Sequence, residues 1–285
     1  MRKALAVILV MAMVFSLTAC GNDNKTIEIN GLKYTLLSDG TYSVSAGEDI
    51  DNYKDIIIPS KIDGIAVTAV SDRAFHMVDN IQTVTIESGI TSVGEYAFCH
   101  CESLTNITFP NTLTSIGNNA FRDCKKLTNI TLPNTLTSIG NHAFSYCESL
   151  TSIDIPDNVT TISIDTFTHC INLTKVNLPD NLITIGYAAF ASCESLTSIT
   201  IPYGTKTITN AAFANCKSLK SINIPDTVTS ICYAPDATTY STFNNIEGLV
   251  INFSGTKMQW TNAFGDSLYL QSKQIVHCTD GDIHP

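Results

Sequence analysis

The sequence carries little positive charge. Its 285 residues include 16 Lys and Arg against 26 Asp and Glu, a formal net charge of −10. Two of the basic residues, Arg2 and Lys3, precede an apolar N-terminal run, and without them the balance is 14 against 26, or −12. Binding to nucleic acid or to anionic lipid depends on clustered basic side chains. We therefore expect neither as a partner.

Motifs of catalysis are also missing. The chain contains no G-x-S-x-G, no H-E-x-x-H and no glycine-rich phosphate loop after a strand. Cys99-His100-Cys101 looks like a metal-binding fragment, but Cys101 belongs to a repeated column expected to point inward, whereas His100 does not. A surface position is the simpler interpretation of the histidines near the repeat turns, which are His76, His100 and His169. We predict no enzyme activity, no cofactor and no metal site.

Long hydrophobic runs are scarce too. The one such run, residues 4–15, follows Arg2-Lys3 and is too short for a membrane-spanning helix, as in a secretory signal peptide. It ends in Leu17-Thr18-Ala19-Cys20, which resembles the bacterial lipobox. This resemblance implies that Cys20 is acylated; the alternative is an ordinary signal peptide with a chance cysteine. We predict a signal peptide over residues 1–19, a lipid-anchored tether over 20–26, and export to the bacterial cell surface.

The chain is rich in one repeated pattern. A phenylalanine, in most coils preceded by alanine, recurs every 23 residues, at Phe75, Phe98, Phe121, Phe144, Phe167, Phe190 and Phe213. Around it runs the template C-x2-L-x2-I-x-[IL]-P-x2-[LV]-x2-I-G-x2-A-F. A fixed period of this length, with hydrophobic residues at fixed offsets, is typical of a solenoid of stacked coils.

Each coil predicts one strand and one turn. Residues 150–155 alternate between apolar and polar as a half-buried strand does, and the following proline ends the strand. Stacked coils would place these strands in parallel, about 4.8 Å apart. The Ile-Gly-x2-Ala-Phe segment is expected to turn the chain back as a short 3₁₀ or helical turn. The Leu, Ile and Phe columns would then form one continuous core.

This template resembles the leucine-rich repeats, and more narrowly the BspA-like (Treponema-type) repeats of bacterial surface proteins, over about residues 56–232. The resemblance implies an α/β, β-rich leucine-rich-repeat solenoid with a parallel sheet on the concave face and short 3₁₀ or helical turns on the convex face. It also implies adhesion through a protein or glycan ligand. Three residues depart from the template and are expected to loosen their coils: Ser163, Thr205 and Thr209.

The two ends read as caps. Residues 27–66 are predicted as an N-terminal cap, with a hairpin at Asn30-Gly31. The repeats then cover 67–232, with an insertion and small turn near residues 62–64 before them. Residues 233–285 are a degenerate repeat and C-terminal cap whose last strand is 274–278. The segment from Phe253 to Trp260 resembles the F-x-G-T-x-x-Q-W sequence that commonly ends such proteins. Trp260 either covers the last coil or serves as a ligand platform.

Six cysteines form one repeat column: Cys101, Cys124, Cys147, Cys170, Cys193 and Cys216. Neighbours in this column would lie within the Cα separation of a disulfide, but identical positions point their Cβ vectors in parallel, which is the wrong geometry. A free cysteine behaves as a small buried hydrophobic residue. We expect a reduced, buried column.

The exposed columns of the sheet are mostly Thr, Ser and Asn. They either keep a parallel sheet soluble or form a polar binding platform. The candidate binding surface comprises Asn129 and the members that fit the template least, Asp154, Lys175 and Asn177. We predict a lipid-anchored cell-surface protein that mediates protein–protein or adhesive interactions with host matrix or other cells. The alternative is a non-adhesive structural or assembly component of the cell envelope.

Overall fold

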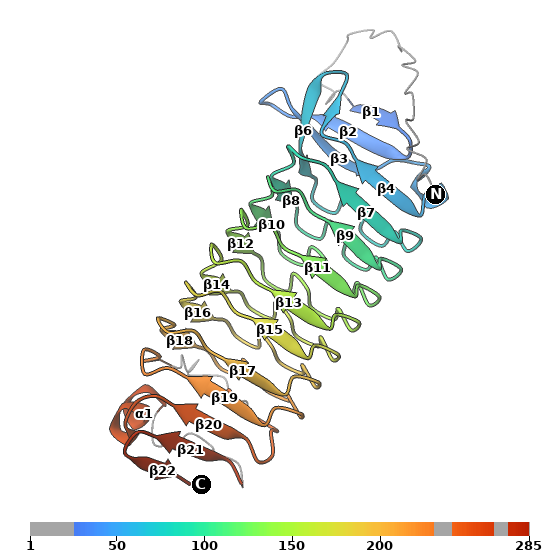
Figure 1. Ribbon diagram of the computed structural model, residues 1–285. Helices are drawn as coiled ribbons and strands as arrows, with labels where there is room; N and C mark the ends of the chain where they lie inside the picture. Colours follow the sequence, from blue (N-terminus) through green and yellow to red (C-terminus); the bar gives the residue numbers. More distant parts are fainter. Residues whose placement is uncertain (1–25, 231–240, 265–272, 285) are drawn as a thin grey trace, which may run out of the picture.

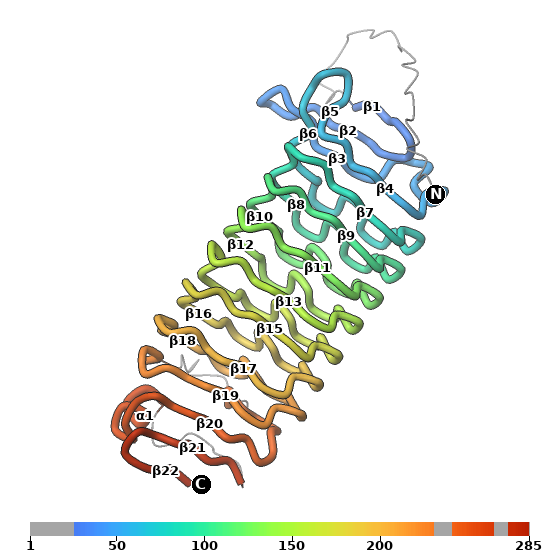
Figure 2. The backbone as a smooth tube through the Cα atoms, in the orientation of Figure 1, coloured from blue at the N-terminus to red at the C-terminus, as the bar shows by residue number. Residues whose placement is uncertain are grey.

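The computed structural model describes residues 26–230, 241–264 and 273–284, and it confirms the solenoid. The coils stack into an elongated rod with a cap at either end (Figure 1). Following the backbone in Figure 2, each coil contributes one longer strand to one side of the rod and a two-residue strand to another. The described residues contain little helix.

The longer strands form the sheet that the template predicts. Within the regular repeats, neighbouring coils pair in parallel and one repeat apart, so that Asn129 faces Asn106 and Thr131 faces Thr108. The strands are β4 (Asp55–Ile58), β7 (Thr83–Ile86), β9 (Asn106–Thr108), β11 (Asn129–Thr131), β13 (Ser152–Asp154), β15 (Lys175–Asn177), β17 (Ser198–Thr200), β19 (Ser221–Ile224), β20 (Val250–Phe253) and β21 (Ile275–Cys278). The strand pairing is interrupted once, between β15 and β17.

A second ladder of short strands runs along the rod. In each short strand of the repeats a Ser or Thr precedes a buried Ile or Val. These strands are β8 (Ser92–Val93), β10 (Ser115–Ile116), β12 (Ser138–Ile139), β14 (Thr161–Ile162), β16 (Thr184–Ile185) and β18 (Thr207–Ile208). The first three extend from β6 (Ile65–Val70), and the other three form a separate sheet.

The return segments contain tight turns instead of regular helix. Their backbone bonds run from residue i+3 to residue i, as in a 3₁₀ helix; Cys99 N donates to Tyr96 O at 3.2 Å and Cys101 N to Phe98 O at 3.1 Å. Left-handed residues interrupt every such segment, for example Tyr96 (φ 55°) and His100 (φ 60°). The intervening N–H groups bond to the next coil, as Phe98 N does to Ala120 O at 2.7 Å. The turns are therefore joined coil to coil.

The core is a stack of identical side chains. The phenylalanine rings lie nearly parallel, with centroids 4.9 Å apart for Phe75 and Phe98 and 6.0 Å apart for Phe213 and Phe243. All are essentially inaccessible to solvent. Buried Leu and Ile columns surround them in one continuous cluster. The predicted columns are thus confirmed as core.

The departures from the template each supply a hydrogen bond. A Cβ on Gly117 would lie 2.7 Å from Glu95 N of the preceding coil, which explains why glycine recurs there. Ser163 replaces that glycine, and its hydroxyl donates to Ile139 O at 2.6 Å. The buried Thr205 hydroxyl donates to Leu182 O at 3.2 Å. These bonds to the preceding coil offset the poorer fit that the sequence suggests.

The N-terminal cap contains the predicted hairpin. Strands β1 (Thr26–Ile29) and β2 (Leu32–Leu36) pair antiparallel around Asn30 (φ 52°) and Gly31 (φ 73°), and β3 (Tyr42–Ala46) joins them to β6. The insertion forms a second tight hairpin, in which β5 (Lys61–Ile62) pairs with β6 across Asp63-Gly64. The Asn80 amide donates to Asp51 O and Tyr53 O at 2.8 Å, next to η1 (Ile50–Asn52), and so ties the cap to the first coil.

The C-terminal cap contains two elements that the sequence analysis missed. Helix α1 (Lys257–Phe264) follows β20, and β22 (Gly281–Ile283) pairs antiparallel with β21 after the last predicted strand. Thr256 and Gln259 cap α1, since Thr256 N donates to Gln259 Oε1 at 2.8 Å. Trp260 is buried and stacks on Phe264 at 3.9 Å, as expected of a residue that covers the last coil. Residues 233–240, at the start of the predicted cap, lie outside the described residues.

Candidate functional site

The four predicted sheet residues lie on neighbouring coils of one face. Asn129, Asp154, Lys175 and Asn177 are all exposed, on β11, β13 and β15. In the strand register Asp154 faces Asn177, whose amide donates to its carboxylate, and Lys175 faces Ser152. Their role in binding stays a prediction, and Cys20, the predicted lipidation site, lies outside the described residues.

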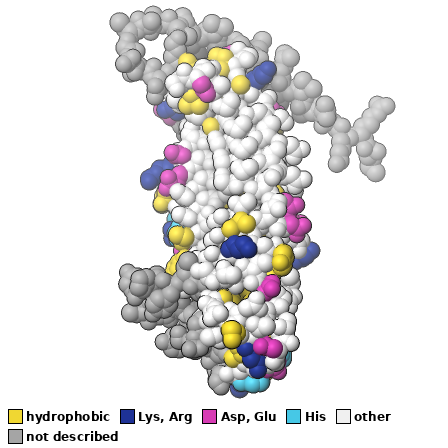
Figure 3. Space-filling model, turned by 90° about the vertical axis from the view of Figure 1, so that its left-hand side faces the viewer, with side chains coloured by type: hydrophobic (Ala, Val, Ile, Leu, Met, Phe, Trp, Pro, Cys, Tyr) yellow, Lys and Arg dark blue, Asp and Glu magenta, His cyan; other side chains and the backbone are white. Residues whose placement is uncertain are grey.

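The turn segments carry a different chemistry. Arg, His and Tyr side chains gather there, at the variable positions that flank each Ala-Phe pair. We call them the turn cluster: Arg73, His76, Tyr96, His100, Arg122, Asp123, His142, Tyr146 and His169. By contrast, charged side chains are sparse over the middle of the face shown in Figure 3, which is the left-hand side of the rod in Figure 1.

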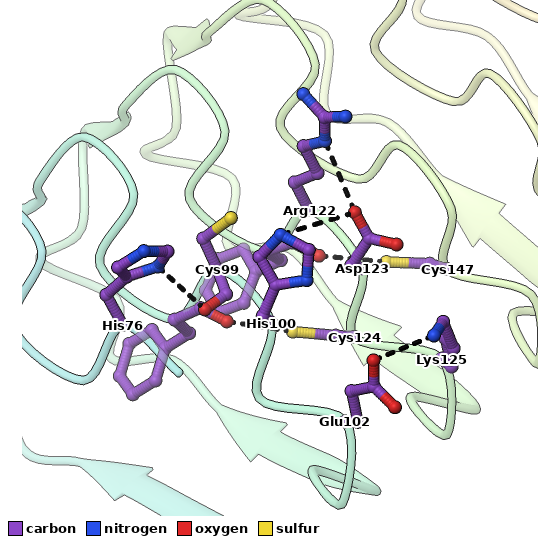
Figure 4. Close-up of polar contacts among 11 residues, drawn as sticks. His76, Cys99, His100, Glu102, Arg122, Asp123, Cys124, Lys125 and Cys147 are labelled. Carbon is purple, nitrogen blue, oxygen red and sulfur yellow. Dashed lines mark hydrogen bonds and ion pairs between the residues drawn. The ribbon is translucent and has the colours of Figure 1, made fainter. Parts of the chain in front are cut away.

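An ion-pair network forms the centre of the turn cluster. Asp123 Oδ2 lies 3.3 Å from Arg122 Nε and 3.8 Å from His100 Nε2 (Figure 4). The Asp123 side chain is only 13% exposed, whereas Arg122 and His100 are 39% and 37% exposed. A largely buried carboxylate thus fixes the positions of two groups that remain open to solvent. On the neighbouring coil His76 Nδ1 lies 3.1 Å from Cys99 O.

Planar groups stack along the rod within the turn cluster. The Arg73 guanidinium carbon lies 5.1 Å from the centroid of the Tyr96 ring, and that of Arg122 lies 5.8 Å from Tyr146. Tyr146 also stacks on His169 of the next coil at 4.5 Å, with the rings 9° from parallel. Because these neighbours come from the preceding and following coils, both faces of Tyr146 are occupied. Its ring edge and hydroxyl are the parts left for a partner.

Two buried polar atoms among the turn segments have no hydrogen-bond partner in the part of the chain that the structure describes. These atoms are Asn119 Oδ1 and Ser145 Oγ, on side chains 6% and 0% exposed. Each adjoins the turn cluster in sequence, since Ser145 precedes Tyr146 and Asn119 lies three residues before Arg122. A buried polar group without a partner costs about 1–3 kcal/mol. Asn80 Oδ1, next to the N-terminal cap, is a third such atom among the described residues.

Burial changes the titration of one carboxyl in these turns. Burial raises the pKa of Asp165 above its usual value, and the nearby His142 partly opposes that shift. The two side chains approach to 3.8 Å between His142 Nε2 and Asp165 Oδ2. This arrangement repeats that of His100 and Asp123 on the preceding coils.

The cysteine column is free and buried, as predicted. Each thiol donates to the phenylalanine carbonyl of the preceding coil, for example Cys124 Sγ to Phe98 O at 3.1 Å (Figure 4). Burial raises the pKa of the Cys101 thiol to about 12 and that of Cys99 to about 11. Protonated thiols in such surroundings are poor nucleophiles and metal ligands. No group of three His, Cys, Asp or Glu within the described ranges could hold a metal ion.

The turn cluster was not predicted from the sequence because its members fill positions that the template leaves open. Three of its histidines lie near the turns, where the sequence predicts ordinary surface residues. A column-by-column reading of the turns would have shown the difference. Where the early coils have Arg73, Tyr96 and His142, the later ones have Ala188 and Ala211.

Comparison with protein families decides the identity of the repeat. The model of the BspA type leucine rich repeat region matches residues 68–193 and 137–271, which together make up more than half of the chain. The chain belongs to this family. BspA-type proteins are typically bacterial surface or secreted proteins, and leucine-rich repeats are generally non-enzymatic protein-interaction modules.

Two solved structures support the assignment. The leucine-rich repeat protein of T. pallidum is 27% identical, with a TM-score of 0.64, over 68% of this chain and 91% of that one. A leucine-rich repeat protein from Bacteroides ovatus is 28% identical, with a TM-score of 0.69, over 81% of this chain and 61% of that one. A search of curated proteins gave no match. Within the described ranges, no helix is long and apolar enough to cross a membrane.

Proposed function

We propose that this BspA-type chain is a lipid-anchored protein of the bacterial cell surface whose repeats bind another protein, in adhesion to host matrix or to other cells. The lipobox ending at Cys20 would supply the anchor, with residues 21–26 as a tether. Two or more acyl chains hold a protein stably in a bilayer. The rod would then present its long sides to the surroundings.

The turn cluster is the observation that carries the binding function. Tyr and Arg dominate the binding energy of protein interfaces because they combine a large contact area with hydrogen-bonding groups. Here Arg122 and Tyr146 are held in place by Asp123 and His169 and remain partly exposed. Pre-positioned side chains lose little conformational freedom on binding. The Thr, Ser and Asn columns of the sheet offer no comparable anchors.

A binding screen with paired variants tests this proposal. The chain from Gly21 onward is passed over immobilised matrix proteins and over whole bacterial cells, beside the double variants Arg122→Ala with Tyr146→Ala and Asp154→Ser with Lys175→Ser. The second variant is the matched control, because it changes the same number of residues but on the sheet face. We expect the turn variant to bind at least about tenfold more weakly, as for the loss of interface anchors, and the sheet variant to bind as the parent does.

Two outcomes would count against parts of the proposal. If no matrix protein or cell binds, and crosslinking on intact cells captures only proteins of the same envelope, the chain is an envelope assembly component. The lipid anchor is wrong if the parent takes up no lipid label and Cys20→Ser stays in the membrane fraction to the same degree as the parent. That second result would leave the proposed binding by the turn cluster unaffected.

A further inference from the structure

The sheet face contains a small hollow apart from the turn cluster. It lies at β9 and β11 and is lined by Asn106, Thr108, Phe109, Asn111, Asn129 and Thr131. The register places Asn106 beside Asn129 and Thr108 beside Thr131, so two amides and two hydroxyls border one spot. Of the four predicted sheet residues, Asn129 alone lines this hollow.

Most polar side chains of this hollow make no hydrogen bond to another described residue. Farther along the sheet, neighbouring coils bond to each other through their side chains, as Asn223 Nδ2 does to Thr200 Oγ1 at 3.0 Å and Asn252 Nδ2 to Asn223 Oδ1 at 2.9 Å. At the hollow, the side chains of Asn106 and Asn111 bond to no described residue, and the Asn129 amide reaches only Thr128 Oγ1, at 3.5 Å. Their hydrogen-bonding capacity is free for a ligand.

Phe109 is also among the residues that line this hollow. Phe109 occupies the column that holds Leu132 and Ile155 in the next coils, and those two are buried. The larger Phe109 ring packs edge-on against Phe121, with centroids 5.8 Å apart, and remains half-buried. Aromatic surface next to free amides is a pairing that sugars favour, because polarised C–H groups are attracted to an aromatic ring while hydroxyls bond to amides.

The lining also limits the class of ligand. Among the described residues, no charged side chain borders the hollow, so none of them would neutralise an acidic or basic group. An extended peptide cannot join the sheet here, because β9 and β11 already pair with strands on both sides. An amide donates and accepts, as a sugar hydroxyl does. We propose that the hollow formed by Phe109, Asn106 and Asn129 binds one neutral sugar unit of a glycan.

Free neutral monosaccharides test the site. The full chain, in a mild detergent, is titrated with glucose, galactose, mannose and N-acetylglucosamine, and saturation-transfer NMR measures binding. Phe109→Leu places the residue of the next coil at this position and so preserves the fold. It should weaken binding about tenfold through the lost ring contact. Asn129→Ser, which copies Ser152, should weaken it as well, while the distant control Asn177→Thr should not.

Several results would overturn the inference. They are the failure of all four sugars to bind, equal binding by the parent and Phe109→Leu, or stronger binding of glucuronic acid than of any neutral sugar. An extended peptide that binds the hollow in place of the sugars would also contradict it. None of these results bears on the turn cluster, so the protein-binding proposal is tested separately.

Discussion

Raising the pH should unfold this protein through its cysteine column. Burial holds the pKa of Cys101, Cys170 and Cys216 at about 12, and it raises that of Cys124, Cys147 and Cys193 well above the ordinary 9.0. The folded chain keeps these protons, whereas the unfolded chain releases them near pH 9. The stability they confer is complete below pH 9 and is lost as the pH rises toward 12.

The size of the effect follows from the number of thiols. One thiol with an ordinary pKa of 9.0 that ionises only on unfolding removes about 1.4 kcal/mol of stability at pH 10. Six such thiols remove several kcal/mol, a large part of the roughly 5–15 kcal/mol that holds a typical domain together. The fully buried positions and the bonds to phenylalanine carbonyls leave no room for a hydrated thiolate.

Denaturation under reducing conditions at pH 7.5 and pH 10, followed by circular dichroism, measures this loss. The double variant Cys147→Ala with Cys170→Ala removes two of the six titrating groups. Its loss of stability between the two pH values should be smaller than that of the parent by roughly 3 kcal/mol, the contribution of two thiols, whatever its stability at pH 7.5. All other titrating groups are common to both proteins. Equal losses in the two proteins would refute the reasoning.

Three further substitutions test the packing and the site. Phe144→Ala, between rings at 5.4 and 5.6 Å, should cost about 3–5 kcal/mol in chemical denaturation; a cost below 1 kcal/mol would contradict the stacked core. Trp260→Ala should cost about as much stability and should make the amides of β20 and β21 exchange before those of the other strands. Equally fast exchange in all strands would argue against a capping role. Ser145→Ala should leave stability unchanged or raise it by about 1 kcal/mol, since the buried hydroxyl has no partner among the described residues and later coils have alanine there; a stability loss above 1 kcal/mol would contradict this.

The core columns could be predicted from the sequence because stacking places each repeat position directly over the same position of the next coil. Phe144 lies between Phe121 and Phe167 for the same reason that the three recur 23 residues apart. The same translation predicted the reduced cysteine column. Helix α1 was missed although Thr256 and Gln259, a capping pair, were both part of the quoted segment.

The turn cluster and the hollow could not be predicted in the same way. The template fixes the positions that face the core and leaves the turn positions free, so their chemistry follows no period. The approach of Arg122 to Tyr146 joins different positions of two coils, and it depends on the left-handed turns that set the side-chain directions. The hollow depends on the size of one residue, Phe109, in a column of smaller ones.

The position of the protein-binding surface is the central claim, and footprinting of a bound complex tests it most directly. Hydroxyl-radical labelling of the chain is compared with and without a protein partner taken from the binding screen. The account predicts that Tyr96 and Tyr146 become protected while Tyr203, which is 76% exposed and outside the turn cluster, keeps its reactivity. Unchanged labelling of Tyr96 and Tyr146, with protection confined to the sheet, would contradict it.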